Sequence, residues 1–129
     1  MINENQKDRI KGEIADYYLD SDGILYSYSK DVLRTVKNIS ENIALVKQIT
    51  GNKPVPLLIY LCDAPIPSRE TRKFSTEKLP EIYTAMAMIS QPGFAHMLMR
   101  VLFKFKAPPI PMKSFLDDAE AKKWLQQYL

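Results

Sequence analysis

Residues 56–71 read PLLIYLCDAPIPSRET, and this stretch decides the fold. The run Leu57–Cys62 carries no charge, which is typical of a strand buried on both faces of a parallel sheet. Pro65 and Pro67 end the strand, because proline has no backbone N–H and a fixed φ. Ser68 then stands where a helix N-cap is expected, ahead of a helix-compatible run. The stretch predicts a strand, a loop and a helix, with the loop at the sheet edge where parallel sheets place functional groups.

The segments before this stretch predict a hairpin and a helix. Asp22-Gly23 is a turn signal between two strand-like segments, since both residue types tolerate the positive φ of a tight turn. Ser40 is expected to cap a helix that precedes the central strand, and Pro80 is expected to end the helix that follows it. The hairpin and the first helix therefore lead directly into the central strand.

The segments after Pro80 continue the alternation of strands and helices. The expected elements are a strand over Tyr83–Ser90, a helix over Phe94–Phe105, a strand over Met112–Phe115 and a last helix from Asp117. Trp124 is expected to anchor the last helix, with Leu116, Ala121 and Leu125 on the same face. The predicted order is β-β-α-β-α-β-α-β-α, an α/β fold with a mixed, mostly parallel sheet and flanking helices.

The composition limits the class of protein. With 129 residues, 46% hydrophobic and 26% charged, the chain suits one domain, expected over residues 13–129 after a flexible segment, residues 1–12. A net charge of +3 without a dense basic run disfavours a nucleic-acid partner. No apolar stretch approaches the roughly 20 residues of a membrane span. A single cysteine, Cys62, and a start without a secretory pattern indicate a cytoplasmic protein.

Several of these features together resemble the STAS/SpoIIAA-like group. They are the order of elements, the strand Leu57–Cys62 with Asp63 after it, and the ending Ala121-x-x-Trp124-Leu125. The resemblance extends over the chain from about residue 13 and is closest to small bacterial proteins of that group. It implies an α/β sandwich that binds partners or ligands, needs no cofactor and is not an enzyme.

Two residues of the loop after the central strand are candidate sites. In the anti-sigma-factor antagonists of the group, a serine at the start of the following helix is phosphorylated by a partner kinase, and Ser68 is nearest to that position. Free amides at a helix N-terminus also favour a phosphate, although helix capping alone would account for Ser68. Asp63 lies at the sheet edge, where it could accept a hydrogen bond from a partner or cap its own loop.

The helix that begins at Phe94 has an apolar arc that is wide for a helix covering a sheet. His96, Arg100 and Lys104 share one narrow polar stripe. The candidate contact residues on the arc are Phe94, Met97, Leu98 and Val101. Three explanations remain open: a self-association interface, the lining of an apolar pocket, or a well-covered core helix with the stripe in solvent.

Two classes of function follow from these predictions. The first is a non-enzymatic regulatory or protein-interaction module, a homodimer through exposed apolar surface, with an unidentified protein partner. The alternative is a carrier or sensor of an apolar small molecule or lipid, which the lipid-carrier branch of the superfamily implies. Its ligand would lie between the Phe94 helix and the sheet, lined by Met86, Met88, Met97 and Met99. No Ser-His-Asp spacing, Gly-rich phosphate loop or metal-ligand pattern points to an enzyme or a metal.

Overall fold

A single mixed sheet forms the centre of the protein. The computed structural model describes residues 9–91, 93–103 and 107–129, and within them six strands follow the order β1-β2-β3-β4-β5-β6 across the sheet. The strands are β1 (Ile10–Lys11), β2 (Ala15–Leu19), β3 (Leu25–Ser29), β4 (Val55–Tyr60), β5 (Tyr83–Ile89) and β6 (Met112–Phe115). The first three are antiparallel neighbours, and β3 to β6 run parallel. This is the predicted α/β class, with β1 as a strand that the sequence did not predict.

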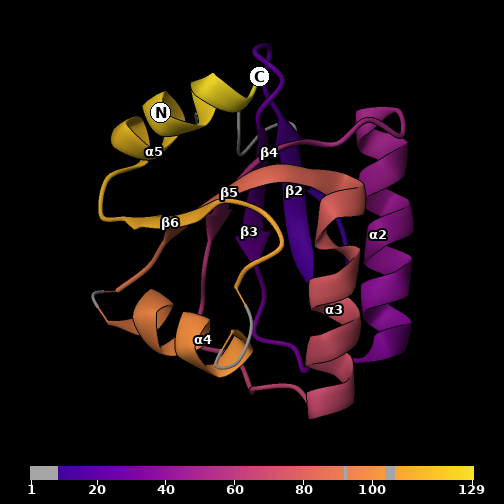
Figure 1. The fold of residues 1–129 in the computed structure, drawn as a ribbon. Helices are drawn as coiled ribbons and strands as arrows, with labels where there is room; N and C mark the ends of the chain where they lie inside the picture. The colour runs from indigo at the N-terminus through magenta and orange to yellow at the C-terminus, as the bar shows by residue number, and fades with distance from the viewer. Residues whose placement is uncertain (1–8, 92, 104–106) are drawn as a thin grey trace.

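Helices cover both faces of the sheet. They are α2 (Val36–Thr50), α3 (Arg69–Ile82), α4 (Phe94–Leu102) and α5 (Asp118–Leu125), followed by the short 3₁₀ turn η1 (Gln126–Tyr128). Side chains of α2, α3 and α4 join the core on one face, and those of α5 join the core on the other. Figure 1 shows α2 and α3 side by side, with α5 on the far side of the molecule from them. The fold therefore has three layers, with the sheet in the middle.

β4 is the buried strand that the sequence predicted, and it lies between β3 and β5. Leu57 and Leu58 are 1% and 0% exposed and pack into the cores on opposite faces. The strand runs over Val55–Tyr60 rather than Leu57–Cys62, so both of its ends lie earlier than predicted. Pro56 fits inside the strand because the pairing register with β5 shifts at this point.

The hairpin between β2 and β3 turns at Asp22-Gly23, as predicted. Gly23 adopts a φ of 100°, which glycine reaches without a steric penalty. Asp20 Oδ1 accepts hydrogen bonds from the N–H groups of Asp22, Gly23 and Ile24 at 2.9, 3.0 and 3.0 Å. Lys122 of α5 lies 3.6 Å from Asp20 Oδ2, so the turn is also joined to the helix layer.

α2 begins earlier than predicted, and the prediction that Ser40 caps it is wrong. The N-cap is Thr35, whose Oγ1 accepts a hydrogen bond from the Asn38 N–H at 3.1 Å. The Asn38 Oδ1 accepts in return from the Thr35 N–H at 2.8 Å, which completes a capping box. Ser40 lies inside the helix and donates to the Val36 carbonyl at 2.8 Å. The reciprocal pair satisfies two backbone donors where a lone serine satisfies one.

α3 starts after the predicted cap Ser68 but does not end at Pro80. The helix continues to Ile82, and the N–H of Tyr83 donates to the Leu79 carbonyl. Pro80 lies in the last turn of the helix. Its missing N–H removes one helical hydrogen bond, but the hydrogen bond that closes the last turn can still form. The prediction that Pro80 ends the helix is therefore wrong by two residues.

α5 packs on the sheet through its apolar face. Ala121 and Leu125 are both 0% exposed, and Trp124 is half-buried against Phe115, with ring centroids 5.7 Å apart. Leu116 is 77% exposed, so the prediction that it shares this face is wrong. The reason is that Leu116 precedes the helix and does not follow its periodicity.

Candidate functional site

α4 and the ends of β5 and β6 lie together at the carboxyl edge of the sheet. Ala95 is 3% exposed and packs into the core. The predicted contact residues Phe94, Met97, Leu98 and Val101 are all half-buried. α4 thus fills the core with part of its circumference and leaves apolar atoms at the surface on the rest.

A hollow of about 250 Å³ connects the start of α4 with the ends of the two strands. Residues that border it include Ser90, Gln91, His96, Ser114, Phe115 and Leu116. Of the predicted polar stripe, His96 and Arg100 are exposed, while Lys104 lies outside the described residues. We call α4 with this hollow and Leu116 the α4 surface.

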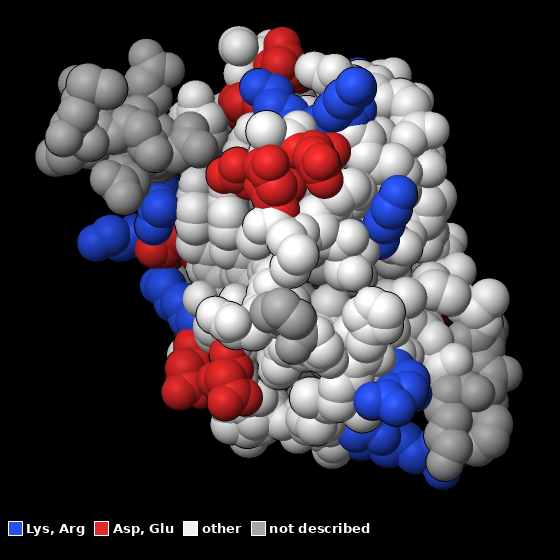
Figure 2. All heavy atoms as spheres, turned by 90° about the vertical axis from the view of Figure 1, so that its left-hand side faces the viewer, with Lys and Arg blue, Asp and Glu red and all other residues white. Residues whose placement is uncertain are grey.

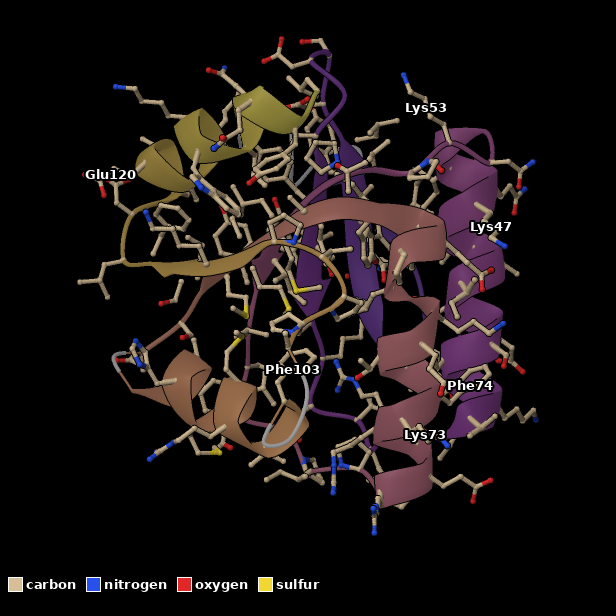
Figure 3. The ribbon with its side chains drawn as sticks, viewed as in Figure 1. Lys47, Lys53, Lys73, Phe74, Phe103 and Glu120 are labelled. Carbon is tan, nitrogen blue, oxygen red and sulfur yellow. The ribbon has the colours of Figure 1, made fainter. Side chains whose placement is uncertain are left out.

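Charged side chains surround the α4 surface. Asp117, Asp118 and Glu120 are exposed at the start of α5, and Figure 3 shows Glu120 pointing outward from the helix. Arg100 is exposed on α4. Figure 2 views this side of the molecule, with an acidic group and adjacent basic side chains toward the top, a second acidic group toward the lower left, basic side chains toward the lower right and an uncharged area in the centre.

The loop after β4 carries the predicted residues Asp63 and Ser68, and both are exposed. Ser68 Oγ accepts a hydrogen bond from the Thr71 N–H at 3.3 Å and donates to Thr71 Oγ1 at 3.0 Å. The predicted N-cap role of Ser68 is therefore confirmed. Arg72 donates to the Pro67 carbonyl at 2.7 Å, which fixes the loop against the first turn of α3. Phosphorylation of Ser68 and partner recognition by Asp63 stay predictions.

Cys62 is half-buried between β4 and this loop, outside the strand in which the sequence placed it. Within residues 9–91, 93–103 and 107–129, no group of three or more His, Cys, Asp or Glu side chains could hold a metal ion. The same described part of the chain contains no helix with the length and apolarity needed to cross a membrane.

A second hollow, of about 170 Å³, lies between the sheet and helices α2 and α3. Ile43, Leu57 and Ile82 are among its apolar walls. One of the alternatives that the sequence left open was an apolar pocket under α4 instead. Of the four methionines expected to line that pocket, Met86 borders the second hollow, and Met88 is 1% exposed in the core.

Polar side chains converge on one part of this second hollow. The Tyr17 hydroxyl lies 2.9 Å from Asn42 Oδ1 and 2.7 Å from Asn42 Nδ2. Ser27 and Tyr83, which are 2% and 5% exposed, also border it. Burial raises the pKa of both phenols, Tyr17 and Tyr83, so each keeps its proton at neutral pH.

Arg34 completes this polar group. Its Nη1 donates to the carbonyls of Lys30 and Val32 at 2.6 and 2.7 Å, and its Nη2 donates to the Ile14 carbonyl at 3.1 Å. Burial lowers the pKa of the guanidinium. Sequence reasoning missed Arg34, although one signal was available: an arginine in a segment otherwise rich in Val and Leu, between a strand and a helix.

The arrangement of strands and helices defines an α/β protein with a SpoIIAA-like fold. A crystal structure of a DUF3478-family protein from Shewanella loihica, described as having a SpoIIAA-like fold, resembles this chain with a TM-score of 0.61. The two are 19% identical over 86% of this chain and 91% of that chain, a likeness that shows the fold. The chain itself belongs to the family described as domain of unknown function DUF7793, whose model matches residues 17–129. No curated protein matches it.

Proposed function

We propose that this protein is a non-enzymatic interaction module that associates with a second copy of itself through the α4 surface. The observation that carries the proposal is the exposure of apolar side chains there. Phe94, Met97, Leu98 and Val101 are half-buried, and Leu116 is 77% exposed nearby. Contiguous exposed apolar surface on a soluble domain is typical of a contact with another protein. In this proposal the contact serves a regulatory or scaffolding role.

The distribution of charge supports a second copy as the partner. One end of the α4 surface carries the exposed carboxylates Asp117, Asp118 and Glu120, and the other carries Arg100. In a twofold dimer whose axis crosses the middle of the patch, at a right angle to the line between its two ends, each end of the patch meets the opposite end on the partner. The acidic end of one copy would then face the basic end of the other, with the apolar residues between them.

The side chains of α4 suit this contact better than the backbone of the edge strand. Among the described strands, β6 pairs with β5 alone and so forms one edge of the sheet. It has four residues, exposes Lys113 and follows Pro111, features that protect an edge against pairing with another strand. The dimer contact is therefore proposed at the helix.

Sedimentation equilibrium tests the proposal with Val101→Glu. The unmodified protein is expected to be a dimer at tens of micromolar, on the order of ordinary dimer affinities. Val101→Glu places an unpaired charge in the contact and should give a monomer. Val36→Glu makes the same chemical change at the exposed start of α2 and should remain a dimer, because Val36 lies outside the α4 surface and an acid suits a helix N-terminus.

Circular dichroism separates loss of contact from loss of fold. Val101→Glu should keep the spectrum and the unfolding transition of the unmodified protein. A monomer for the unmodified protein at these concentrations would overturn the proposal, and so would a folded Val101→Glu variant that remains a dimer.

A carrier or sensor of a small molecule is the second candidate function. The observation in its favour is the hollow of about 170 Å³ under α2 and α3, with apolar walls and one polar end at Tyr17, Asn42 and Arg34. Binding pockets commonly combine apolar walls with a few converging polar groups. The two candidates use different parts of the molecule and can be tested separately.

A further inference from the structure

We infer that the hollow between the sheet and helices α2 and α3 is a binding site for a small organic carboxylate. The apolar body of the ligand would lie against Leu57 and Ile82, and its carboxylate would meet Arg34 beside Tyr17 and Asn42. The inference rests on the second candidate function and gives that function a chemical class of ligand.

The volume of the hollow sets the size of the ligand. At about 170 Å³ it is comparable to cavities that accept a single benzene molecule. Its walls include Ile43, Leu57 and Ile82, which offer no hydrogen bonds to the body of a ligand. The ligand is therefore a compact molecule with one apolar ring or branched chain, too small to be a membrane lipid.

Arg34 sets the charge of the ligand. Three of its five N–H donors reach the carbonyls of Ile14, Lys30 and Val32, and the other two have no partner in the part of the chain that the structure describes. Asp31 acts on Arg34 only through space, and no described carboxylate lies within 4.0 Å of the guanidinium. A partly buried cation held by carbonyls alone favours an anion that accepts the remaining donors.

The other groups around the hollow fit the same ligand. Lys78 also borders it, and its ammonium lies 3.1 Å from Glu81, a carboxylate that pairs with Lys47 at 3.0 Å as well. The Tyr17 and Tyr83 phenols stay protonated and so do not repel an anion, and the Tyr17 hydroxyl already donates its proton to Asn42 Oδ1 at 2.9 Å. Arg34 differs from Lys78 in having no carboxylate partner among the described residues, so Arg34 is the group that discriminates between charged and neutral ligands.

Three probes of similar size test the inference: benzoate, benzyl alcohol and benzylamine. Binding is followed by amide chemical shifts in two-dimensional NMR, with affinities from titration calorimetry. Benzoate should bind and shift the amides of Tyr17, Ser27 and Asn42, which border the hollow. Benzyl alcohol should bind about tenfold more weakly, and benzylamine should not bind.

Two variants and one control locate the site. Arg34→Gln should weaken benzoate binding by about tenfold or more. Ala15→Leu should abolish it, because Ala15 is a buried residue in the wall of the hollow and a larger side chain fills the space. Arg72→Gln is the matched control, because Arg72 also donates to a backbone carbonyl but lies outside the hollow, and it should bind benzoate as the unmodified protein does.

The outcomes separate the ligand class from the function on which it rests. Equal binding of all three probes would overturn the carboxylate and leave a small-molecule site. No binding of any probe at millimolar concentration would overturn both. Benzoate that binds Ala15→Leu unchanged would place the site elsewhere and overturn the inference. If Arg34→Gln fails to fold, the comparison of the three probes on the unmodified protein still decides the question.

Discussion

At the scale of single residues, the start of α2 depends on two side chains that cap each other. Thr35→Ala removes the oxygen that accepts the Asn38 N–H, and it should lower the free energy of unfolding by about 1 kcal/mol. Ser40→Ala removes a hydroxyl that bonds within the helix and should leave stability nearly unchanged. Urea unfolding measures both variants. A larger loss for Ser40→Ala would contradict the assignment of the cap.

The buried phenols predict how stability depends on pH. Burial raises the pKa of Tyr17 in the folded protein, so the unfolded chain releases this proton near pH 10 while the folded protein keeps it. The contribution of this pKa shift to the free energy of unfolding is complete below about pH 10. It is lost as the pH rises toward the pKa of Tyr17 in the folded protein. Above about pH 10, the free energy of unfolding should fall less steeply with pH in Tyr17→Phe than in the unmodified protein. The two slopes should differ by about 1.4 kcal/mol per pH unit. Urea midpoints between pH 8 and 11 measure this difference, and parallel curves would contradict it.

Local signals in the sequence identified some of these residues and not others. The capping role of Ser68 was predictable, because an N-cap hydrogen bond joins residues that are only a few positions apart in the sequence. Thr35 was missed because asparagine replaces the usual Glu or Gln of a capping box. The role of Arg34 could not be predicted, because one of its acceptors, the Ile14 carbonyl, lies just before β2 and 20 residues away in the sequence.

At the scale of elements, α5 and the following η1 are the helical segments that cover this face of the sheet within the described residues, so the anchor of α5 has a large effect. Leu125 is 0% exposed, and Leu125→Ala should lower the free energy of unfolding by about 2–5 kcal/mol. Leu116→Ala makes the same change at a residue that is 77% exposed and should have little effect. Urea unfolding of the two variants measures the difference. Equal losses would show that α5 is not held through this face.

The sequence predicted the elements better than their ends. Uniform apolar character was enough to identify β4, and turn chemistry was enough for the hairpin at Asp22-Gly23. The predicted start of α2 and the predicted end of α3 were wrong. Each end is set by a hydrogen bond between two residues, and the type of a single residue does not reveal that bond. β1 was missed because two residues carry no periodicity, and pairing with β2 defines them as a strand.

At the scale of the whole molecule, the two proposed sites occupy different regions of the three-layer fold. The α4 surface lies at the carboxyl edge, on α4 and the ends of β5 and β6. The hollow under α2 and α3 is bordered by β2, β3, β4 and β5 and by both helices. β5 contributes to both, through Ser90 just beyond its end and through Tyr83 and Met86 within it. β5 is therefore an element that directly joins the two sites.

The last prediction is that the two sites act independently. Met86 borders the hollow and belongs to β5, an interior strand of the sheet. Its neighbours β4 and β6 pair with it on both sides and fix its position. A small ligand can then fill the hollow without moving the end of β5, so benzoate should not change the dimer dissociation constant. Likewise, Val101→Glu should abolish the dimer and leave benzoate affinity unchanged. Sedimentation with and without benzoate measures the first effect, and calorimetry on Val101→Glu measures the second. A change in either quantity by more than about threefold would show that the two sites are coupled, because reciprocity requires both to shift together.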